Sequence, residues 1–219
     1  GTTAYIGIAV TSHEPSARTT AAVSGVTIAS SALPAGQTAA DIGAPAIKGK
    51  TSFSAGRYAI TAGGADIWDS ADQFHYVYQV ISGDVEVIAR VASITMAHKW
   101  AKAGVMVRET LAPGARHATA LVSAAAGYAF QRRADTDAWS DHTAGGSGTP
   151  PGWVRLVRKG AQFEAFRSPD GVKWTSMGTA TIAMNTDVYV GLAVTSHNVT
   201  TATTAVIDSL KVTRTTSTT

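Results

Sequence analysis

The chain has 219 residues, a net charge of +3 and 15% charged residues, against about 25% in an average globular protein. With so few charges, Thr, Ser, Ala and Gly must cover the surface, which favours an extracellular or cell-surface β protein. The Lys and Arg residues are scattered, so the sequence does not predict a nucleic-acid partner. Cysteine is absent, which excludes disulfides and thiolate chemistry. No apolar stretch approaches the roughly 18 residues of a transmembrane helix, so we expect no membrane insertion.

The first element along the chain is a segment that the sequence contains twice. Residues 5–13, YIGIAVTSH, recur 184 residues further on as YVGLAVTSH at 189–197. The same offset holds without a gap up to residues 28 and 212. A fixed period indicates a tandem array of similar units. We therefore expect residues 1–30 to be the C-terminal hairpin of a preceding repeat, or an exchanged arm.

The next segment, 31–46, carries Pro34, Gly36, Gly43 and Pro45 among small residues, which predicts a linker. The sequence then predicts one module over 47–213 and a tail over 214–219. An all-β sandwich of this length can form a single domain with a sizeable core.

Short alternating segments, separated by Gly, Pro, Asp and Asn, fill that module. Alternation is clear in 85–91 and 153–158, and Ser168-Pro-Asp-Gly171 predicts a tight turn. No window of 11 or more residues has a helical period. The sequence therefore predicts an all-β fold of two packed antiparallel sheets. The expected strands are 57–61, 74–80, 85–93, 103–109, 117–123, 127–133, 153–159, 162–167, 172–176, 188–195 and 204–212.

Six segments of the module together resemble a known family. They are GADIW at 64–68, FHYVY at 74–78, KAGVMVRE at 102–109, WVRL at 153–156, SPDGVKW at 168–174 and VYVGLAV at 188–194. The chain from 41 to 213 resembles a bacterial LamG-like module of the concanavalin-A-like lectin/glucanase superfamily. This resemblance implies a jelly-roll β-sandwich that is carried, often in tandem, by secreted multi-domain proteins. It also implies that the partner is a polysaccharide.

Hydrolytic members of that superfamily need two carboxylates across the scissile bond. This chain has four Glu residues, and none lies in the Glu-x-Asp-x-x-Glu strand pattern of the hydrolases. We therefore expect no catalytic residues and no enzyme activity. The four are Glu14, Glu86, Glu109 and Glu164.

Sugar binding needs an aromatic face for stacking and planar polar groups for the hydroxyls. Two Trp residues, at 100 and 139, lie in or beside predicted loops next to His or Arg, whereas Trp153 and Trp174 lie in strand patterns and are expected in the core. Alternation on neighbouring strands also predicts one polar face. The predicted carbohydrate-binding residues are Trp100, Trp139, His98, Arg108, Gln131 and Arg133.

Carboxylates in loops could ligate a structural calcium ion, which takes six to eight oxygen ligands. The first candidate cluster is Asp66, Asp69 and Asp72, and a second runs from Asp135 to Asp141. Turn and capping bonds are the alternative for such loop Asp residues. The six His residues lie in separate segments, which does not favour zinc. His13 and His197 are expected to cap the same strand end in each repeat.

Two functions remain open at this point. The first is a non-catalytic carbohydrate-binding module that holds a larger secreted protein on a polymer. The second is a structural repeat of an adhesin, sheath or filament that assembles head to tail through its terminal strands. In either case we expect residues 4–28 to complete or extend the sheet of a neighbouring copy, and the alternative is a free sheet edge of the same chain.

Overall fold

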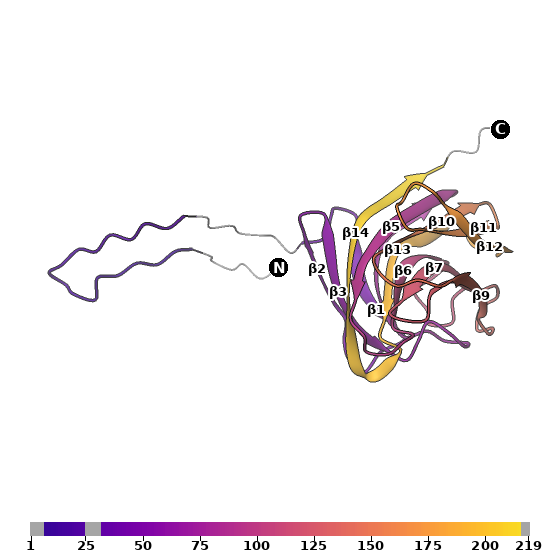
Figure 1. Cartoon of the computed structure of the whole chain (residues 1–219), viewed down its shortest axis with the longest axis horizontal. Coiled ribbons are helices and arrows are strands. Elements are labelled where there is room, and N and C mark those ends of the chain that lie inside the picture. The colour runs from indigo at the N-terminus through magenta and orange to yellow at the C-terminus, as the bar shows by residue number, and fades with distance from the viewer. Residues whose placement is uncertain (1–6, 25–31, 216–219) are drawn as a thin grey trace. The chain divides into compact units, whose positions relative to one another are not determined.

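The computed structural model describes residues 7–24 and 32–215, and the chain divides into two units, Gly1–Ser30 and Ser31–Thr219. The second unit holds two antiparallel sheets of seven strands each. Figure 1 shows β14, β5 and β10 in one layer and β13, β6 and β7 in the other. The described residues contain no helix, and hence none that could span a membrane. The predicted all-β sandwich is confirmed.

We call the first sheet the front sheet and the second the back sheet. In spatial order, the front sheet contains β1 (Thr38–Ile42), β4 (Phe74–Ser82), β13 (Asp187–Thr195), β6 (Lys102–Arg108), β7 (His117–Ser123), β8 (Tyr128–Arg133) and β9 (Asp141–Gly146). The back sheet contains β12 (Thr175–Thr181), β11 (Gln162–Ser168), β10 (Gly152–Lys159), β5 (Val85–Ile94), β14 (Asn198–Arg214), β3 (Arg57–Gly64) and β2 (Lys50–Ser54).

The main core lies between the sheets and follows from the period of two in the strands. In β5, Val85, Val87, Ala89 and Val91 are fully buried, while the residues between them are half-buried. Full burial of one such Val side chain is worth about 1.5–3 kcal/mol relative to exposure. The inner faces of both sheets supply the same kind of residue, which explains why the sheets stack.

The outer face of the front sheet is also covered, by the three loops 65–73, 109–116 and 134–140. Backbone hydrogen bonds join the loops to one another: Asp72 donates to Pro113, Asp137 to Gly114, and Ser140 to Asp69. A second apolar cluster lies beneath, made of Ile42, Ile67, Phe74, Tyr76, Met106 and Ala193. Strands β6 and β7 are consequently buried on both faces.

All four edge strands differ from the sequence expectation. Strands β1, β2 and β9 were not predicted, and β12 begins at Thr175 rather than at 172. An edge strand pairs on one side only and here carries Thr, Ser, Ala and Gly, so apolar alternation is weak. Strand β12 begins later than expected because the Asp170 carboxylate accepts hydrogen bonds from the amides of Val172 and Lys173. These bonds extend the turn that precedes the strand.

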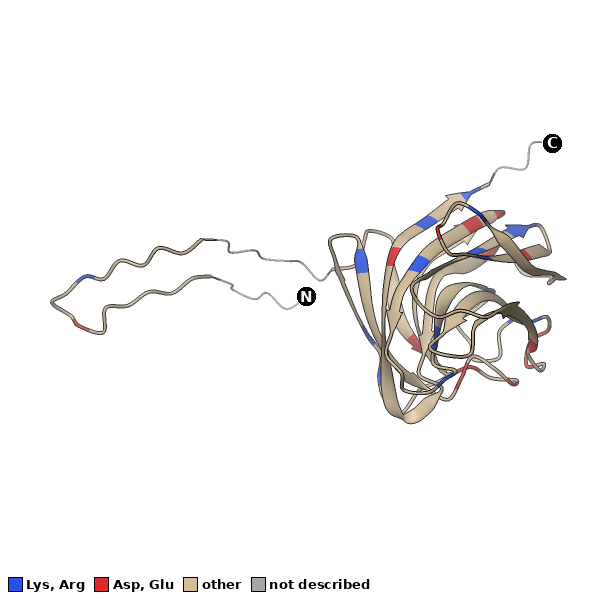
Figure 2. Ribbon diagram, viewed as in Figure 1, with Lys and Arg blue, Asp and Glu red and all other residues tan. Residues whose placement is uncertain are grey.

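Two expected boundaries and two expected core residues also change. The segment 31–46 contains β1, whose residues pair with β4, so this part is a strand and not a linker. At the other end, β14 continues to Arg214. Trp153 and Trp174 are only half-buried and so lie outside the core; the guanidinium of Arg155 stands 5.7 Å from the Trp174 ring. Figure 2 shows both signs of charge interspersed over the module, in line with the scattered Lys and Arg positions.

In the first unit, residues 7–24 form no strand, so the predicted hairpin pairing is not observed in this range. The chain reverses direction there (Figure 1), at a turn closed by a bond from the Ala17 amide to the Glu14 carbonyl. The remaining parts of the predicted hairpin, residues 4–6 and 25–28, lie outside the described residues.

Candidate functional site

A pocket of about 360 Å³ opens on the outer face of the front sheet, beside the three covering loops. Strands β6, β8 and β9 each supply one side chain, and the loops 65–73 and 95–101 and the β13–β14 turn supply the rest. The lining residues are Asp66, Trp68, Trp100, Lys102, Gln131, His142 and His197.

Two indole rings form the aromatic part of the pocket. The His142 ring stands edge-on to both, with its centroid 6.2 Å from that of Trp68 and 5.8 Å from that of Trp100. Both Trp side chains are half-buried, so part of each indole remains exposed to solvent. Such rings offer an apolar, electron-rich face to a ligand.

The polar part of the pocket is a hydrogen-bonded chain of side chains. Lys102 is 1% exposed, and its Nζ lies 2.5 Å from Asp66 Oδ1 and 3.2 Å from Gln131 Oε1. The other end of the Gln131 amide, Nε2, lies 3.4 Å from His142 Nδ1. The lysine therefore orients both a carboxylate and an amide toward the pocket.

A pair of stacked imidazoles, those of His98 and His197, adjoins this row of hydrogen-bonded side chains. His197 Nδ1 lies 2.8 Å from Asp66 Oδ2, and the His197 ring stacks on His98 at a centroid distance of 4.4 Å. His197 has a positive φ of 51° in the turn between β13 and β14, consistent with a turn residue. It also contacts the pocket, a role that its place after a Thr-Ser strand end does not reveal.

Three titratable groups of the pocket, Asp66, Lys102 and His142, have pKa values shifted by burial and by their neighbours. Burial alone would raise the pKa of Asp66, but the bond from His197 and the charge of Lys102 outweigh it and lower that pKa. Burial lowers the pKa of Lys102, against the attraction of Asp66. Burial, Lys102 and Arg132 together lower the pKa of His142, so its ring is neutral at pH 7. Within the pocket, the charges of Asp66 and Lys102 therefore offset each other as an ion pair.

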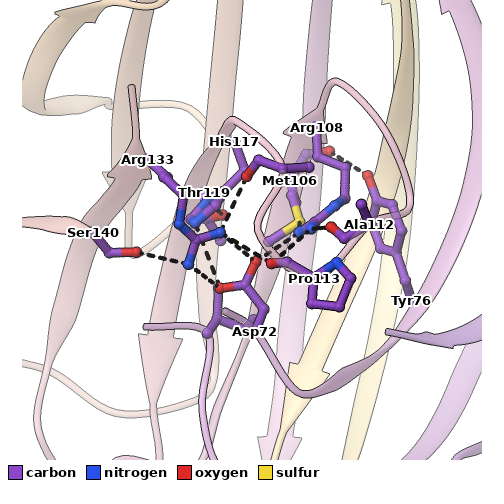
Figure 3. Close-up of polar contacts among 12 residues, drawn as sticks. Asp72, Tyr76, Met106, Arg108, Ala112, Pro113, His117, Thr119, Arg133 and Ser140 are labelled. Carbon is purple, nitrogen blue, oxygen red and sulfur yellow. Dashed lines mark hydrogen bonds and ion pairs between the residues drawn. The ribbon is translucent and has the colours of Figure 1, made fainter. Parts of the chain in front are cut away.

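Two residues predicted to bind sugar are instead buried in a separate cluster (Figure 3). Arg108 and Arg133 are both fully buried and face the equally buried Asp72. Arg108 Nη1 donates to Asp72 Oδ2 at 2.9 Å, and Arg133 donates through Nη2 and Nη1 to the two carboxylate oxygens at 2.7 and 2.9 Å. These guanidinium groups cannot be the exposed contacts that we predicted, because the covering loops remove them from solvent.

Both arginines hold the covering loops in place. Arg133 donates to the carbonyls of Trp68, Asp69 and Ala138, and to the hydroxyl of Ser140. Arg108 donates to the carbonyls of Thr110, Ala112 and Pro113. Arg133 is therefore a positioning residue for the loop that carries Trp68 into the pocket.

The predicted calcium cluster is not assembled. Asp66 bonds with Lys102 and His197, Asp72 bonds with two arginines, and the Asp69 side chain is exposed. Among residues 7–24 and 32–215, no three His, Asp or Glu side chains are placed to hold a metal ion. Guanidinium and ammonium groups occupy the carboxylate oxygens that we expected to ligate calcium.

Of the other predicted residues, Trp100 and Gln131 line the pocket and His98 stacks against one of its lining residues. Trp139 is 73% exposed and does not line the pocket. The sequence analysis missed five of the lining residues as binding candidates. Asp66 was assigned to calcium and His197 to a strand-end cap, Trp68 was not assigned, and Lys102 and His142 had no role. Lys102 precedes Arg108 by six positions on one strand, so alternation alone places it on the same face.

No protein-family model matches the chain, and no curated protein matches it. Solved structures match at the level of the fold. A functionally unknown protein from Saccharomyces cerevisiae has a TM-score of 0.65 at 14% identity, covering 83% of this chain and 97% of the other. The carbohydrate binding module CBM66 from Bacillus subtilis has a TM-score of 0.54 at 14% identity, covering 81% and 94%.

The exoplasmic/lumenal domain of VIP36, in a form bound to Ca²⁺ and Man3GlcNAc, has a TM-score of 0.51 at 7% identity, covering 83% of this chain and 84% of the other. Glycoside hydrolase chains also contain a region of this fold. At such identities the likeness concerns the fold alone. The chain therefore shares the antiparallel two-sheet β-sandwich fold of these structures, among them a carbohydrate binding module and a lumenal sugar-bound domain.

Proposed function

We propose that this chain is a non-catalytic carbohydrate-binding module and that the pocket between Trp68, Trp100 and Lys102 binds a sugar residue of a polysaccharide. The observation that carries the proposal is the combination of two partly exposed indoles with a fixed row of amide, carboxylate, ammonium and imidazole groups. Sugar rings present apolar CH faces and a rim of hydroxyls, which need both kinds of group.

The size and charge of the pocket favour an uncharged sugar. Its volume of about 360 Å³ falls within the range of small-molecule sites, roughly 300–1,000 Å³. Lys102 is already paired with Asp66, and the His142 ring is neutral at pH 7. Little positive charge is left to recognise a phosphate or a carboxylate, so hydroxyl groups fit better.

The carboxylates support a role in binding rather than hydrolysis. Glycosidases use two carboxyl groups flanking the bond, one of which must be protonated when it acts as an acid. Asp66 is the single carboxylate among the lining residues, and its lowered pKa keeps it ionised at neutral pH. Asp66 therefore lacks both the partner and the proton that general-acid catalysis requires.

A matched pair of Trp variants tests the proposal. If a sugar stacks on Trp100, the Trp100→Ala variant should lose about 1–3 kcal/mol of binding free energy. Trp139→Ala is the control, because Trp139 is exposed but lies outside the pocket. A glycan array would identify a ligand for the parent, and affinity electrophoresis or calorimetry with that glycan would compare the variants. Equal loss in both variants, or no loss in Trp100→Ala, would refute the site.

The repeated segment favours a second candidate, a structural repeat of an extracellular assembly. The two candidates share the expectation of a secreted, tandem-repeat bacterial protein, which we retain as part of the proposal. They differ in the pocket: a spacer unit needs no ligand. Failure of the parent to bind any glycan on a broad array would favour the structural candidate.

A further inference from the structure

Residues 5–28 carry the sequence of the two central strands of the module. Ten of their 24 positions are identical to residues 189–212, which form most of β13 and most of β14. In the sandwich, β13 pairs with β4 and β6, and β14 pairs with β3 and β5. We call this place the β13–β14 slot. The question is whether residues 5–28 keep the features that the slot requires.

The apolar positions are kept, but in the first unit they are exposed. Three of the exposed large hydrophobic residues lie there, and each aligns with a residue that is fully buried in the slot. Ile8, Val10 and Val23 are 58%, 53% and 52% exposed, whereas Leu192, Val194 and Ile207 are 0% exposed. The apolar residues of this segment thus have the spacing of two buried strands. Residues 7–24, however, form no strand in the first unit.

Glycine is kept at the position where the slot demands it. A Cβ on Gly191 would lie 1.9 Å from the Val77 carbonyl oxygen, so no side chain fits between β13 and β4. A Cβ on Gly7, the aligned residue, would meet no atom within 4 Å. The surroundings of Gly7 in the first unit give no reason for glycine, whereas the slot does.

The turn between the two strands is kept as well, and it forms without the sheet. Ser12 Oγ donates to the Glu14 carbonyl at 2.7 Å, and Ser196 Oγ donates to the Asn198 carbonyl at 2.6 Å. His13 has φ 59° and His197 has φ 51°. Residues 12–14 thus already have the local geometry of the β13–β14 turn, and in the slot His13 would take the place of His197 beside Asp66.

We propose that residues 5–28 are a strand donor that fills the β13–β14 slot of a second copy of this module. The partner is a copy whose slot is open, and the donated pair supplies its two central strands together with a His for its pocket. Exposed apolar residues, the unexplained Gly7 and the preformed turn each match this partner. The proposal is independent of the sugar-binding function.

The donor competes with the chain's own β13 and β14. In an intact copy these strands are covalently attached, and their high effective concentration keeps the slot filled. Donation therefore requires an open slot, and the test must create one in the full chain. The Gly191→Val variant does so, because the new side chain meets the Val77 backbone.

Three full-length proteins form the experiment: the parent, Gly191→Val, and the double variant Gly7→Val/Gly191→Val. Light scattering after size-exclusion chromatography measures their mass, and near-UV circular dichroism with thermal unfolding measures the packed sandwich. We expect the parent to be a folded monomer. Gly191→Val should fold as dimers or larger assemblies, because the donor segment of one chain fills the slot of another. The double variant should lose cooperative unfolding, since neither its own β13 and β14 nor the donor segment of another chain fits the slot.

Equal folding of the single and double variants, whether both fold or both fail, would overturn the proposal. A Gly191→Val protein that folds as a monomer at every concentration would also overturn it, because the segment would then act within its own chain.

A peptide gives an independent measurement. Added to the double variant, a synthetic peptide of residues 1–30 should restore the near-UV signal and a cooperative transition at stoichiometric amounts. The same peptide with Gly7→Val is the matched control and should restore neither. Restoration by both peptides, or by neither, contradicts the donor role.

Discussion

Two polar clusters lie side by side on the outer face of the front sheet, and only one of them is open. Strand β6 supplies Lys102 to the open cluster and Arg108 to the closed one, and β8 supplies Gln131 and Arg133 in the same way. By strand alternation, the two residues of each strand lie on the same outer face of the sheet. The covering loops make them different, because they seal Arg108 and Arg133 around Asp72 and leave Lys102 and Gln131 facing a pocket.

The difference teaches how the site is built. In the closed cluster, carbonyl groups and one carboxylate satisfy both guanidinium groups, which fixes three loops on the sheet. The Trp68 loop belongs to this group and carries its indole into the open cluster. The closed cluster therefore supports the pocket, and the two should respond differently to substitution.

The largest effect is expected from Asp72→Asn. This change keeps the shape of the side chain but leaves two buried guanidinium groups without their counter-charge, which should lower the free energy of unfolding by about 3–5 kcal/mol. Urea unfolding followed by Trp fluorescence measures it. Asp69→Asn is the control, because that side chain is exposed. A loss below 1 kcal/mol in Asp72→Asn would mean that the closed cluster does not support the fold.

The closed cluster also contains His117, which is fully buried with its Nε2 3.9 Å from Asp72 Oδ1, so we expect the cluster to respond to acid. Burial lowers the pKa of His117 to about 3, aided by the charges of Arg108 and Arg133 against the attraction of Asp72. The unfolded His has a pKa near 6.5. Between these pH values the unfolded chain binds a proton that the folded chain does not, so the free energy of unfolding falls by up to about 1.4 kcal/mol per pH unit as pH decreases.

Unfolding experiments from pH 7 to pH 4 measure this slope. His117→Leu is the comparison, and its stability should fall less steeply between pH 6.5 and 4.5. The lowered pKa values of Asp66 and Asp72 add a loss of stability at lower pH, as those carboxylates become protonated. The same slope in the parent and in His117→Leu would contradict a neutral, buried His117.

In the open cluster, Lys102→Met should cost less stability than Asp72→Asn. Asp66 keeps its contact with His197 and is partly exposed, so its carboxylate is not stranded when the ammonium group is removed. We expect a loss of about 1.5–3 kcal/mol, the scale of a hydrogen bond to a charged group. If urea unfolding gave Lys102→Met the same loss as Asp72→Asn, the distinction between the two clusters would fail.

The smallest effect is expected from Ser140→Ala, at the rim of the closed cluster. Its hydroxyl donates to the Asp69 carbonyl at 3.0 Å and accepts from Arg133 at 3.2 Å. Arg133 keeps its other partners, so the loss should be about 1 kcal/mol. Thermal unfolding would detect it. A loss as large as that of Asp72→Asn would show that the hydroxyl, and not the carboxylate, fixes the loops.

The candidate site was only partly predictable. Trp100 and Gln131 were found because a Trp beside polar residues and a polar strand face are local features. Arg108 and Arg133 were predicted to bind sugar but are buried, since the sequence places them on the outer face without showing that loops cover that face. Alternation places Lys102 on the same strand face as Arg108, but the sequence does not show that Lys102 and His142 line a pocket, because that depends on contacts with partners 29 and 11 residues away.

The sequence by itself determined the central strands, their inward faces, the β13–β14 turn and its copy at residues 12–14. These features depend on a period of two or on bonds within a few residues. The tertiary structure decided the edge strands, the loops over the front sheet and the division into a closed and an open polar cluster. Those depend on pairings between distant segments, since an edge strand or a buried arginine is defined by what lies beside it rather than by its own neighbours in the chain.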